Sequence, residues 1–260
     1  MHIPEKSLNL KDTLMGQIRL GLCGEPATGK TTSALTFPNV IVADFDGGLT
    51  RFSGENIIFI PFYDEEWVCN FGFKPTKPRA TANRRDAFLK FLEEDVLKMS
   101  NEQTLLLDSW TALQNAFDLQ QDTDPPKVTK EGKTDDYYFW QKKIEYCEKI
   151  VVRLKACKCH VVVTFHEDKV RDKNTGQLLD KIAPLMQGKF VAQLKSHFTD
   201  FFHMICEEEK NKDGIVTKCS YWWQVASNNR VDIKTRLKFP EGTFKIEPHF
   251  KIFEQYKNKI

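Results

Sequence analysis

Short apolar runs alternate with amphipathic stretches along most of the chain. The apolar runs predict strands at residues 17–23, 40–46, 57–62, 103–107 and 160–165. Apolar residues that recur every three or four positions predict helices at residues 30–36, 84–99, 111–119 and 137–155. Strands that are apolar on both faces are typical of a parallel sheet covered by helices on each side. The alternation therefore predicts an α/β fold with a mostly parallel central sheet flanked by helices.

The last third of the chain has a different pattern. Residues 200–207 and 215–226 predict two strands, and Lys212-Asp213-Gly214 predicts the turn between them. We expect this antiparallel hairpin to extend one edge of the sheet. Polar stretches at residues 121–136 and 167–189 predict loops, and residues 67–83 predict an irregular segment. Because no shift in composition marks a boundary, we expect an N-terminal segment at residues 1–16 and a single core domain at residues 17–260.

Composition narrows the class of protein. Of 260 residues, 41% are hydrophobic, which indicates a globular chain. The formal net charge of +2 is too small to indicate a nucleic-acid partner without local clustering. No apolar run approaches the length that crosses a bilayer, so we expect no membrane partner. The seven irregularly spaced cysteines indicate reduced thiols and therefore a cytoplasmic protein.

A phosphate-binding motif follows the first predicted strand. The sequence GEPATGKT fits G-x-x-x-x-G-K-[ST] at every fixed position. Glycines let the backbone curl so that successive N–H groups face an anion, and the helix start adds its positive dipole end. Lys30 then reaches the β- and γ-phosphates of ATP, and the Thr31 hydroxyl ligates Mg²⁺. The predicted ATP-binding residues are Gly24, Glu25, Pro26, Ala27, Thr28, Gly29, Lys30, Thr31 and Thr32.

Three acids end predicted strands. The run TLLLD presents Asp108 at the end of a buried strand, where ligands bind in open α/β sheets. We expect Asp108 to hold Mg²⁺ together with Thr31. Asp44 and Asp46 end another strand, where a carboxylate orients or deprotonates the attacking water. Asp46 is the first candidate for this catalytic role and Asp44 the second; a simple turn rich in Asp and Gly is the alternative.

His166 follows the predicted strand at residues 160–165. This position belongs to the same sheet edge as Lys30 and Asp108. A hydrogen-bonding side chain there senses the γ-phosphate and moves the segment behind it, so His166 is a candidate catalytic switch. The alternative is a histidine that only satisfies the end of a strand.

These segments, in this order, resemble the RecA-like recombinase family. GEPATGKTT resembles its P-loop, VADFDGG the strand with its catalytic acid, and TLLLDSWTAL its Walker B segment. VVVTFHEDKV lies where that family has a sensor strand. The resemblance is greatest to phage members that consist of the core alone, the single-strand annealing ATPases of the Sak-four type, also described as phage nucleotide-binding proteins. VDIKTRLKFPEGTFKI is similar to their C-terminal end.

The resemblance implies a RecA-like P-loop fold and an ATP- and Mg²⁺-dependent ATPase of phage recombination. It implies single-stranded DNA bound by the segments at residues 121–136 and 167–189, and a homo-oligomer, either ring or filament. A single-strand binding protein is a further partner to expect. The basic residues of the two segments are Lys127, Lys130 and Lys133 in the first, and Lys169, Arg171, Lys173, Lys181 and Lys189 in the second.

Two departures from that family concern the chemistry. Its catalytic acid is usually Glu, whereas Asp46 is one methylene shorter, which predicts slower hydrolysis. Its switch residue is often Gln, whereas His166 titrates near neutral pH. In an oligomer, Lys234 or Arg236 would act as a finger on the γ-phosphate of a neighbouring subunit. Their alternation in a strand would place both on one face, which also suits a plain solvated edge.

Other functions stay open at this point. One is a small-molecule kinase with the same loop, although the chain has no compact arginine-rich lid. Another is a DNA motor or packaging ATPase that moves on duplex DNA. A third is a nucleotide-gated binding module with weak hydrolysis, which the short Asp46 favours.

Overall fold

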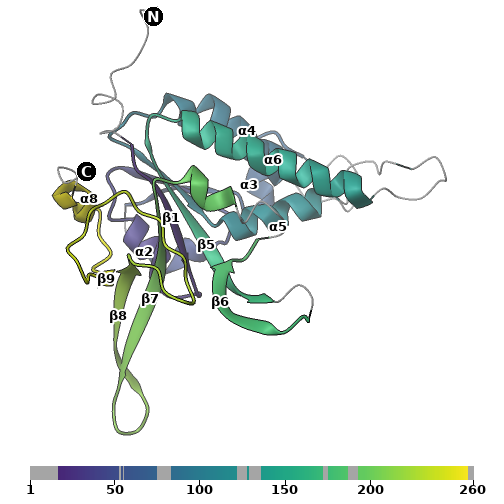
Figure 1. Cartoon of the computed structure of the whole chain (residues 1–260). Coiled ribbons are helices and arrows are strands. Elements are labelled where there is room, and N and C mark those ends of the chain that lie inside the picture. Colours follow the sequence, from purple (N-terminus) through teal and green to yellow (C-terminus); the bar gives the residue numbers. More distant parts are fainter. Residues whose placement is uncertain are drawn as a thin grey trace, which may run out of the picture.

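The computed structural model describes residues 17–52, 54, 56–74, 83–121, 128, 136–171, 175–186 and 193–256. A nine-stranded sheet forms the centre, and eight of its strands follow the order β3-β2-β4-β5-β1-β7-β8-β9, while β6 pairs with β5 (Figure 1). The strands are β1 (Arg19–Gly24), β2 (Val40–Asp44), β3 (Ile58–Pro61), β4 (Thr104–Asp108), β5 (His160–Arg171), β6 (Leu178–Pro184), β7 (Asp200–Lys210), β8 (Val216–Gln224) and β9 (Lys245–Ile246).

The first six strands of that order are parallel, and β8, β9 and β6 pair antiparallel with their neighbours. Helices cover both faces of the sheet (Figure 1). The described helices are α2 (Lys30–Ala34), α3 (Glu65–Asn70), α4 (Arg84–Glu94), α5 (Trp110–Gln121), α6 (Asp136–Ala156) and α8 (Lys251–Tyr256), with 3-10 turns η1 (Gly48–Phe52), η2 (Val96–Lys98) and η3 (Lys195–His197). The predicted α/β fold is confirmed.

Two hydrophobic clusters hold the layers together, one on each face of the sheet. Because side chains alternate along a strand, Leu105 and Leu107 of β4 pack with helices α4, α5 and α6, whereas Leu106 packs on the side of α2 and α8. All three leucines are fully buried. This two-sided burial explains why the central strands are continuous apolar runs in the sequence.

The antiparallel hairpin predicted near the C-terminus is confirmed. β7 pairs with β8 from His203–Gln224 to Lys210–Val216, and Gly214 lies in the turn with a φ of 80°. Trp223 of β8 is buried, and its indole Nε1 donates a hydrogen bond of 2.9 Å to the Ser33 hydroxyl in α2. The hairpin is therefore anchored to the helix that follows the GEPATGKT motif.

Three sequence predictions differ from the structure. Residues 167–189 were expected to form a loop, but β5 continues to Arg171 and pairs with β6. Residues 67–83 were expected to be irregular, but α3 extends into them, and the Asp64 side chain caps it by accepting from the Trp67 N–H at 3.1 Å. Lys234 and Arg236 do not lie on a described strand; Lys234 forms only an isolated bridge with Phe201.

Most of the first predicted DNA segment, including Lys127, Lys130 and Lys133, lies outside the described residues, as do Lys173 and Lys189 of the second. The N-terminal segment at residues 1–16 lies outside them too. Within the described part of the chain, no helix is both long and apolar enough to cross a membrane. The seven cysteines are free thiols.

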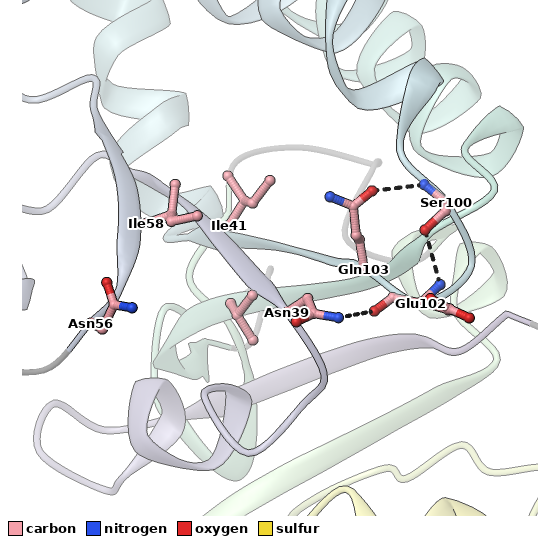
Figure 2. Close-up of a pocket in the computed structure, with 8 residues that line it drawn as sticks. Asn39, Ile41, Asn56, Ile58, Ser100, Glu102 and Gln103 are labelled. Atoms are coloured by element: carbon pink, nitrogen blue, oxygen red, sulfur yellow. Dashed lines mark hydrogen bonds between the residues drawn. The ribbon is translucent and has the colours of Figure 1, made fainter.

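A cavity of about 490 Å³ lies where β2, β3 and β4 begin, at the opposite end of the strands from the GEPATGKT loop (Figure 2). Its polar groups serve local turns. The Asn39 amide donates to the Glu102 carbonyl at 2.9 Å, and the Gln103 amide oxygen accepts from the Ser100 N–H at 2.9 Å. Since these groups bond to one another, the cavity offers no convergent chemistry.

Candidate active site

The GEPATGKT loop has the curled backbone that phosphate binding needs. It leaves the end of β1 at Gly24 and reaches α2 at Lys30, with positive φ values of 62° at Ala27 and 82° at Gly29. A Cβ on Gly24 would lie 2.9 Å from the Thr28 hydroxyl and 3.0 Å from the Met204 Cβ, so that position has room only for glycine. The predicted helix at residues 30–36 is shorter in the structure and ends at Ala34.

Lys30 lies under this loop. Its ammonium donates to the carbonyls of Gly24 at 2.8 Å and Glu25 at 2.6 Å, and only 7% of the residue is exposed. Burial lowers the pKa of the ammonium, while the negative charges of Asp108, Glu167 and Asp46 oppose that effect. The loop therefore holds a nearly dehydrated cation against its own backbone carbonyls.

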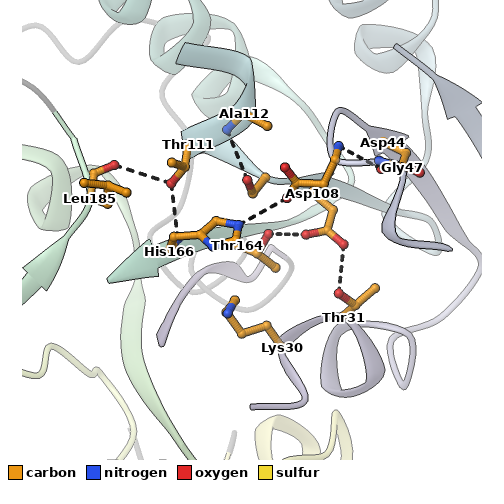
Figure 3. Close-up of polar contacts among 12 residues, drawn as sticks. Lys30, Thr31, Asp44, Gly47, Asp108, Thr111, Ala112, Thr164, His166 and Leu185 are labelled. Carbon is orange, nitrogen blue, oxygen red and sulfur yellow. Dashed lines mark hydrogen bonds and ion pairs between the residues drawn. The ribbon is translucent and has the colours of Figure 1, made fainter. Parts of the chain in front are cut away.

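Asp108 lies between two hydroxyl groups (Figure 3). The Thr31 Oγ1 donates to its Oδ2 at 2.8 Å, and the Thr164 Oγ1 donates to its Oδ1 at 2.5 Å. The carboxylate is buried, at 7% exposure. A threonine hydroxyl and a carboxylate are hard oxygen ligands of the kind that Mg²⁺ uses beside substrate phosphates. The donor set of Thr31 and Asp108 therefore fits the magnesium role expected from the sequence.

Asp44 is held inside the turn that follows β2. Its Oδ1 accepts from the N–H groups of Asp46 at 3.1 Å and Gly47 at 2.9 Å. Its Oδ2 is buried and has no partner among the described residues. Burial raises the pKa of the carboxyl to about 6. With 1% exposure, Asp44 shapes the turn and does not face the GEPATGKT loop as an open base.

Asp46 is the accessible acid of the pair. Its Oδ2 lies 3.3 Å from the His166 Nε2, and each side chain is 31% exposed. Burial alone raises the pKa of the Asp46 carboxyl, but hydrogen bonds from His166 and Ser109 and the charge of Lys30 outweigh it, so the pKa lies below its usual value. Asp46 is thus an ionised acceptor with a histidine beside it.

Sheet register explains how these residues meet. His166 pairs with Gly24 where β5 runs beside β1, and Asp44 pairs with Asp108 where β2 runs beside β4. The carboxyl ends of parallel strands thereby bring Lys30, Asp108 and His166 to one edge, as the sequence predicts. The side-chain contacts at that edge, drawn in Figure 3, converge on Asp108 and His166.

Sequence reasoning missed several residues of the site. Thr164 is a polar residue inside the apolar run VVVTF, and that interruption was its only signal. Tyr221 of β8 is another such residue, since its ring lies 3.0 Å from the position that a Cβ on Gly29 would take. Glu167 and His203, which are 36 residues apart, form a hydrogen bond of 2.7 Å that nothing in the sequence indicates.

Lys234 and Arg236 are not close to these groups by any described contact. The Lys234 ammonium donates to the carbonyls of Phe198 at 2.7 Å and Lys195 at 3.0 Å. The Arg236 N–H donates to the Asp200 carboxylate at 3.0 Å, at the start of β7. These contacts hold Lys234 within its own chain, and a finger role for either residue stays a prediction. Thr32, the last predicted phosphate-loop residue, is exposed on α2.

Comparison with known proteins assigns a family. The profile described as an AAA domain matches residues 17–237. The chain belongs to the AAA domain family. No curated protein matches the sequence.

Two solved structures resemble this chain with low sequence identity and low TM-scores. One is the RadB recombinase, at 10% identity and a TM-score of 0.38, over 80% of this chain and 87% of that one. The other is an ATPase from the type III secretion system of pathogenic bacteria, at 10% identity and a TM-score of 0.38, over 76% of this chain and 53% of that one.

Membership of the AAA domain family agrees with the predicted class, a nucleotide-binding P-loop ATPase. The family match covers every residue of the site described above, from Gly24 to His203. The predicted α/β fold, a mostly parallel sheet with an antiparallel extension, is confirmed by the strand order, and the AAA domain match agrees with a P-loop NTPase.

Proposed function

We propose that this AAA domain protein hydrolyses ATP with Mg²⁺ and that single-stranded DNA controls the reaction. The observation that carries the proposal is the hydrogen-bonded set Thr31–Asp108–Thr164 beside Lys30. A hydroxyl, a carboxylate and an ammonium group at the mouth of a curled loop are the groups that phosphoryl transfer needs.

In this proposal the loop amides and Lys30 hold the β- and γ-phosphates. Thr31 and Asp108 would hold Mg²⁺, which would neutralise charge on the phosphates, and Thr164 fixes the Asp108 carboxylate by its hydrogen bond. Lys30 leaves the carbonyls of Gly24 and Glu25 and donates to phosphate oxygens instead. This exchange keeps the buried ammonium hydrogen-bonded in both states.

Asp46 orients the attacking water, and His166 orients Asp46 through their contact of 3.3 Å. Because the pKa of Asp46 is lowered, its carboxylate is ionised and accepts a hydrogen bond from water at neutral pH. A weak base at this position supports slow hydrolysis, in line with the shorter side chain.

DNA control is supported by the strand that leaves the site. β5 continues from His166 into the hairpin with β6, which presents Lys169, Arg171 and Lys181 as exposed cations. Phosphates of single-stranded DNA on this hairpin would act on a strand that already contacts the catalytic acid. We propose annealing or recombination of the phage type as the cellular role, in the cytoplasm and with a single-strand binding protein as a possible partner.

One experiment tests this function. The rate of ATP hydrolysis is measured with and without single-stranded oligonucleotide across a salt series. We expect stimulation that fades between about 50 and 200 mM salt, because the release of counterions that favours DNA binding contributes less as the salt concentration rises. Hydrolysis that is insensitive to DNA at low salt would contradict DNA control, and phosphate transfer to an added nucleoside would favour the kinase alternative.

A nucleotide-gated binding module with negligible hydrolysis is the second candidate. The observation that favours it is the lowered pKa of Asp46, which weakens it as a base. Such a module would form a stable complex with ATP and DNA without phosphate release. Retention of unhydrolysed ATP over hours, with DNA still bound, would support this candidate.

A further inference from the structure

A second buried pair lies across the strand that carries the phosphate loop. β1 has β5 on one side and β7 on the other, and it ends at Gly24. His203 pairs with Cys23 in register, and Glu167 follows His166, the partner of Gly24. Their side chains meet across the end of β1, where the His203 Nε2 and the Glu167 Oε2 are 2.7 Å apart. Each of these side chains is only 12% exposed. The contact therefore joins β5 to β7 directly at the start of the phosphate loop.

The pair lies on the opposite face of the sheet from the contact between His166 and Asp46. Successive residues of a strand point to opposite faces, so His166 reaches Asp46 while Glu167 reaches His203. The end of β5 is thus fixed on both faces within two residues. The second ring nitrogen of His203, Nδ1, is buried without a partner among the described residues. A polar atom left unpaired carries a cost that simple packing would avoid.

The pair also lines a groove beside the phosphate loop. Glu167 and His203 line a groove of about 680 Å³ together with the outer side of the loop at Glu25, Pro26 and Thr28. The negative charge of Glu167 is one of the influences that raise the pKa of Lys30 against burial. Any shift of β5 relative to β7 would therefore change the shape of this groove and the electrostatic potential at Lys30.

We propose that Glu167 and His203 are positioning residues for ATP hydrolysis: their hydrogen bond fixes the end of β5 to β7 and so keeps His166 against Asp46. This inference rests on the hydrolysis proposed above. We call this hydrogen bond the clamp. Geometry at the reacting centre affects the rate of hydrolysis much more than it affects the affinity for ATP. Loss of the clamp therefore slows turnover while the loop still binds the nucleotide.

Two substitutions at one position separate positioning from packing. His203→Leu keeps bulk but removes the nitrogen that bonds Glu167. His203→Gln keeps an N–H donor at a similar distance. We expect His203→Leu to lower kcat about tenfold with ATP affinity within about threefold of the parent, and His203→Gln to restore kcat to within about threefold. Glu167→Leu removes the acceptor of the same hydrogen bond and should lower kcat as His203→Leu does.

Controls make each outcome decisive. Glu207→Gln removes another ion pair of β7, the one with Lys245 at 2.5 Å, and should leave both constants unchanged. ATP-binding stoichiometry of each variant, measured by calorimetry, corrects kcat for misfolded protein. His203→Leu with the parent kcat, or His203→Gln as slow as His203→Leu, would overturn the proposal. Parallel loss of affinity and turnover, as in Lys30→Ala, would do so too.

Failure of the proposed function has a different signature. A parent protein that releases no phosphate from ATP would remove the reaction that the clamp is proposed to serve, and both proposals would fall together. An active parent whose turnover is unchanged in Glu167→Leu and His203→Leu would overturn the positioning role alone.

Discussion

Two carboxylates at the end of β2 make different contacts although they are only two residues apart. Asp44 bonds two backbone N–H groups inside the turn, whereas Asp46 faces His166 and the phosphate loop. The sequence predicted both acids at the site and ranked Asp46 first, but it could not show which one is buried. That difference depends on the turn geometry after β2, which the sequence pattern does not encode.

The first prediction concerns Asp46. Asp46→Asn keeps the shape of the side chain and removes its charge, so ATP binding should persist while kcat falls about 100-fold. The measurement is steady-state phosphate release beside calorimetric ATP affinity. Asp44→Asn is the matched comparison, since its amide oxygen still accepts both backbone bonds. A larger loss of turnover in Asp44→Asn than in Asp46→Asn would reverse the assigned roles.

The second prediction concerns pH and Asp44. The pKa of this carboxyl is about 6 in the folded chain, against about 3.9 for an unfolded aspartate. The folded state therefore binds the proton more tightly, and the parent loses stability as pH rises from about 4 to 6. Asp44→Asn lacks this loss, so its free energy of unfolding relative to the parent should rise by about 1–3 kcal/mol over that range. Urea unfolding at pH 4, 5, 6 and 7 measures the difference, and a difference independent of pH would contradict it.

At the scale of elements, apolar runs located the buried strands correctly because two-sided burial leaves a continuous signal. β4 begins and ends within one residue of the predicted segment. β6 carries no such signal, since Leu178, Leu179 and Asp180 are all exposed. It pairs only with the end of β5, at residues 167–171. The Glu167–His203 contact escaped prediction for a related reason: it depends on β5 and β7 both flanking β1, which is a property of topology.

The third prediction belongs to the β5–β6 hairpin. Lys169→Ala and Lys181→Ala should each weaken single-stranded DNA binding, and each should lower the slope of log K against log salt by about 0.7. Fluorescence anisotropy of a labelled oligonucleotide at several salt concentrations measures both quantities. Lys218→Ala, an exposed lysine of the β7–β8 hairpin paired with Glu209, is the control. An equal effect in the control would show that DNA does not prefer the β5–β6 hairpin.

At the scale of the whole molecule, the active-site edge of the sheet carries two hairpins, β5–β6 and β7–β8, that extend beyond the helical layers (Figure 1). Within the described chain the candidate site has the GEPATGKT loop, the hydrogen-bonded Thr31 and Asp108, and the acid Asp46, but no arginine is described in contact with Lys30 or Asp108. A basic residue from a second subunit would supply the further positive charge that stabilises the transition state of phosphoryl transfer.

The fourth prediction follows from that arrangement. ATP with Mg²⁺ should promote a homo-oligomer, and hydrolysis per chain should rise with protein concentration. Light scattering with a slowly hydrolysed ATP analogue measures the assembly. Arg236→Ala should lower kcat at saturating protein concentration without changing ATP affinity, because a finger acts on a neighbour. Hydrolysis per chain that is constant over a 100-fold dilution would contradict the role in trans.

The central claim is that the GEPATGKT loop binds and hydrolyses ATP, and Lys30 is its most direct test. ATP affinity and phosphate release are measured for the parent and for Lys30→Ala, with circular dichroism as the check on folding. The account predicts a folded Lys30→Ala protein with ATP affinity at least about tenfold weaker and turnover at least about 100-fold lower. A folded variant that binds and hydrolyses ATP as the parent does would contradict it.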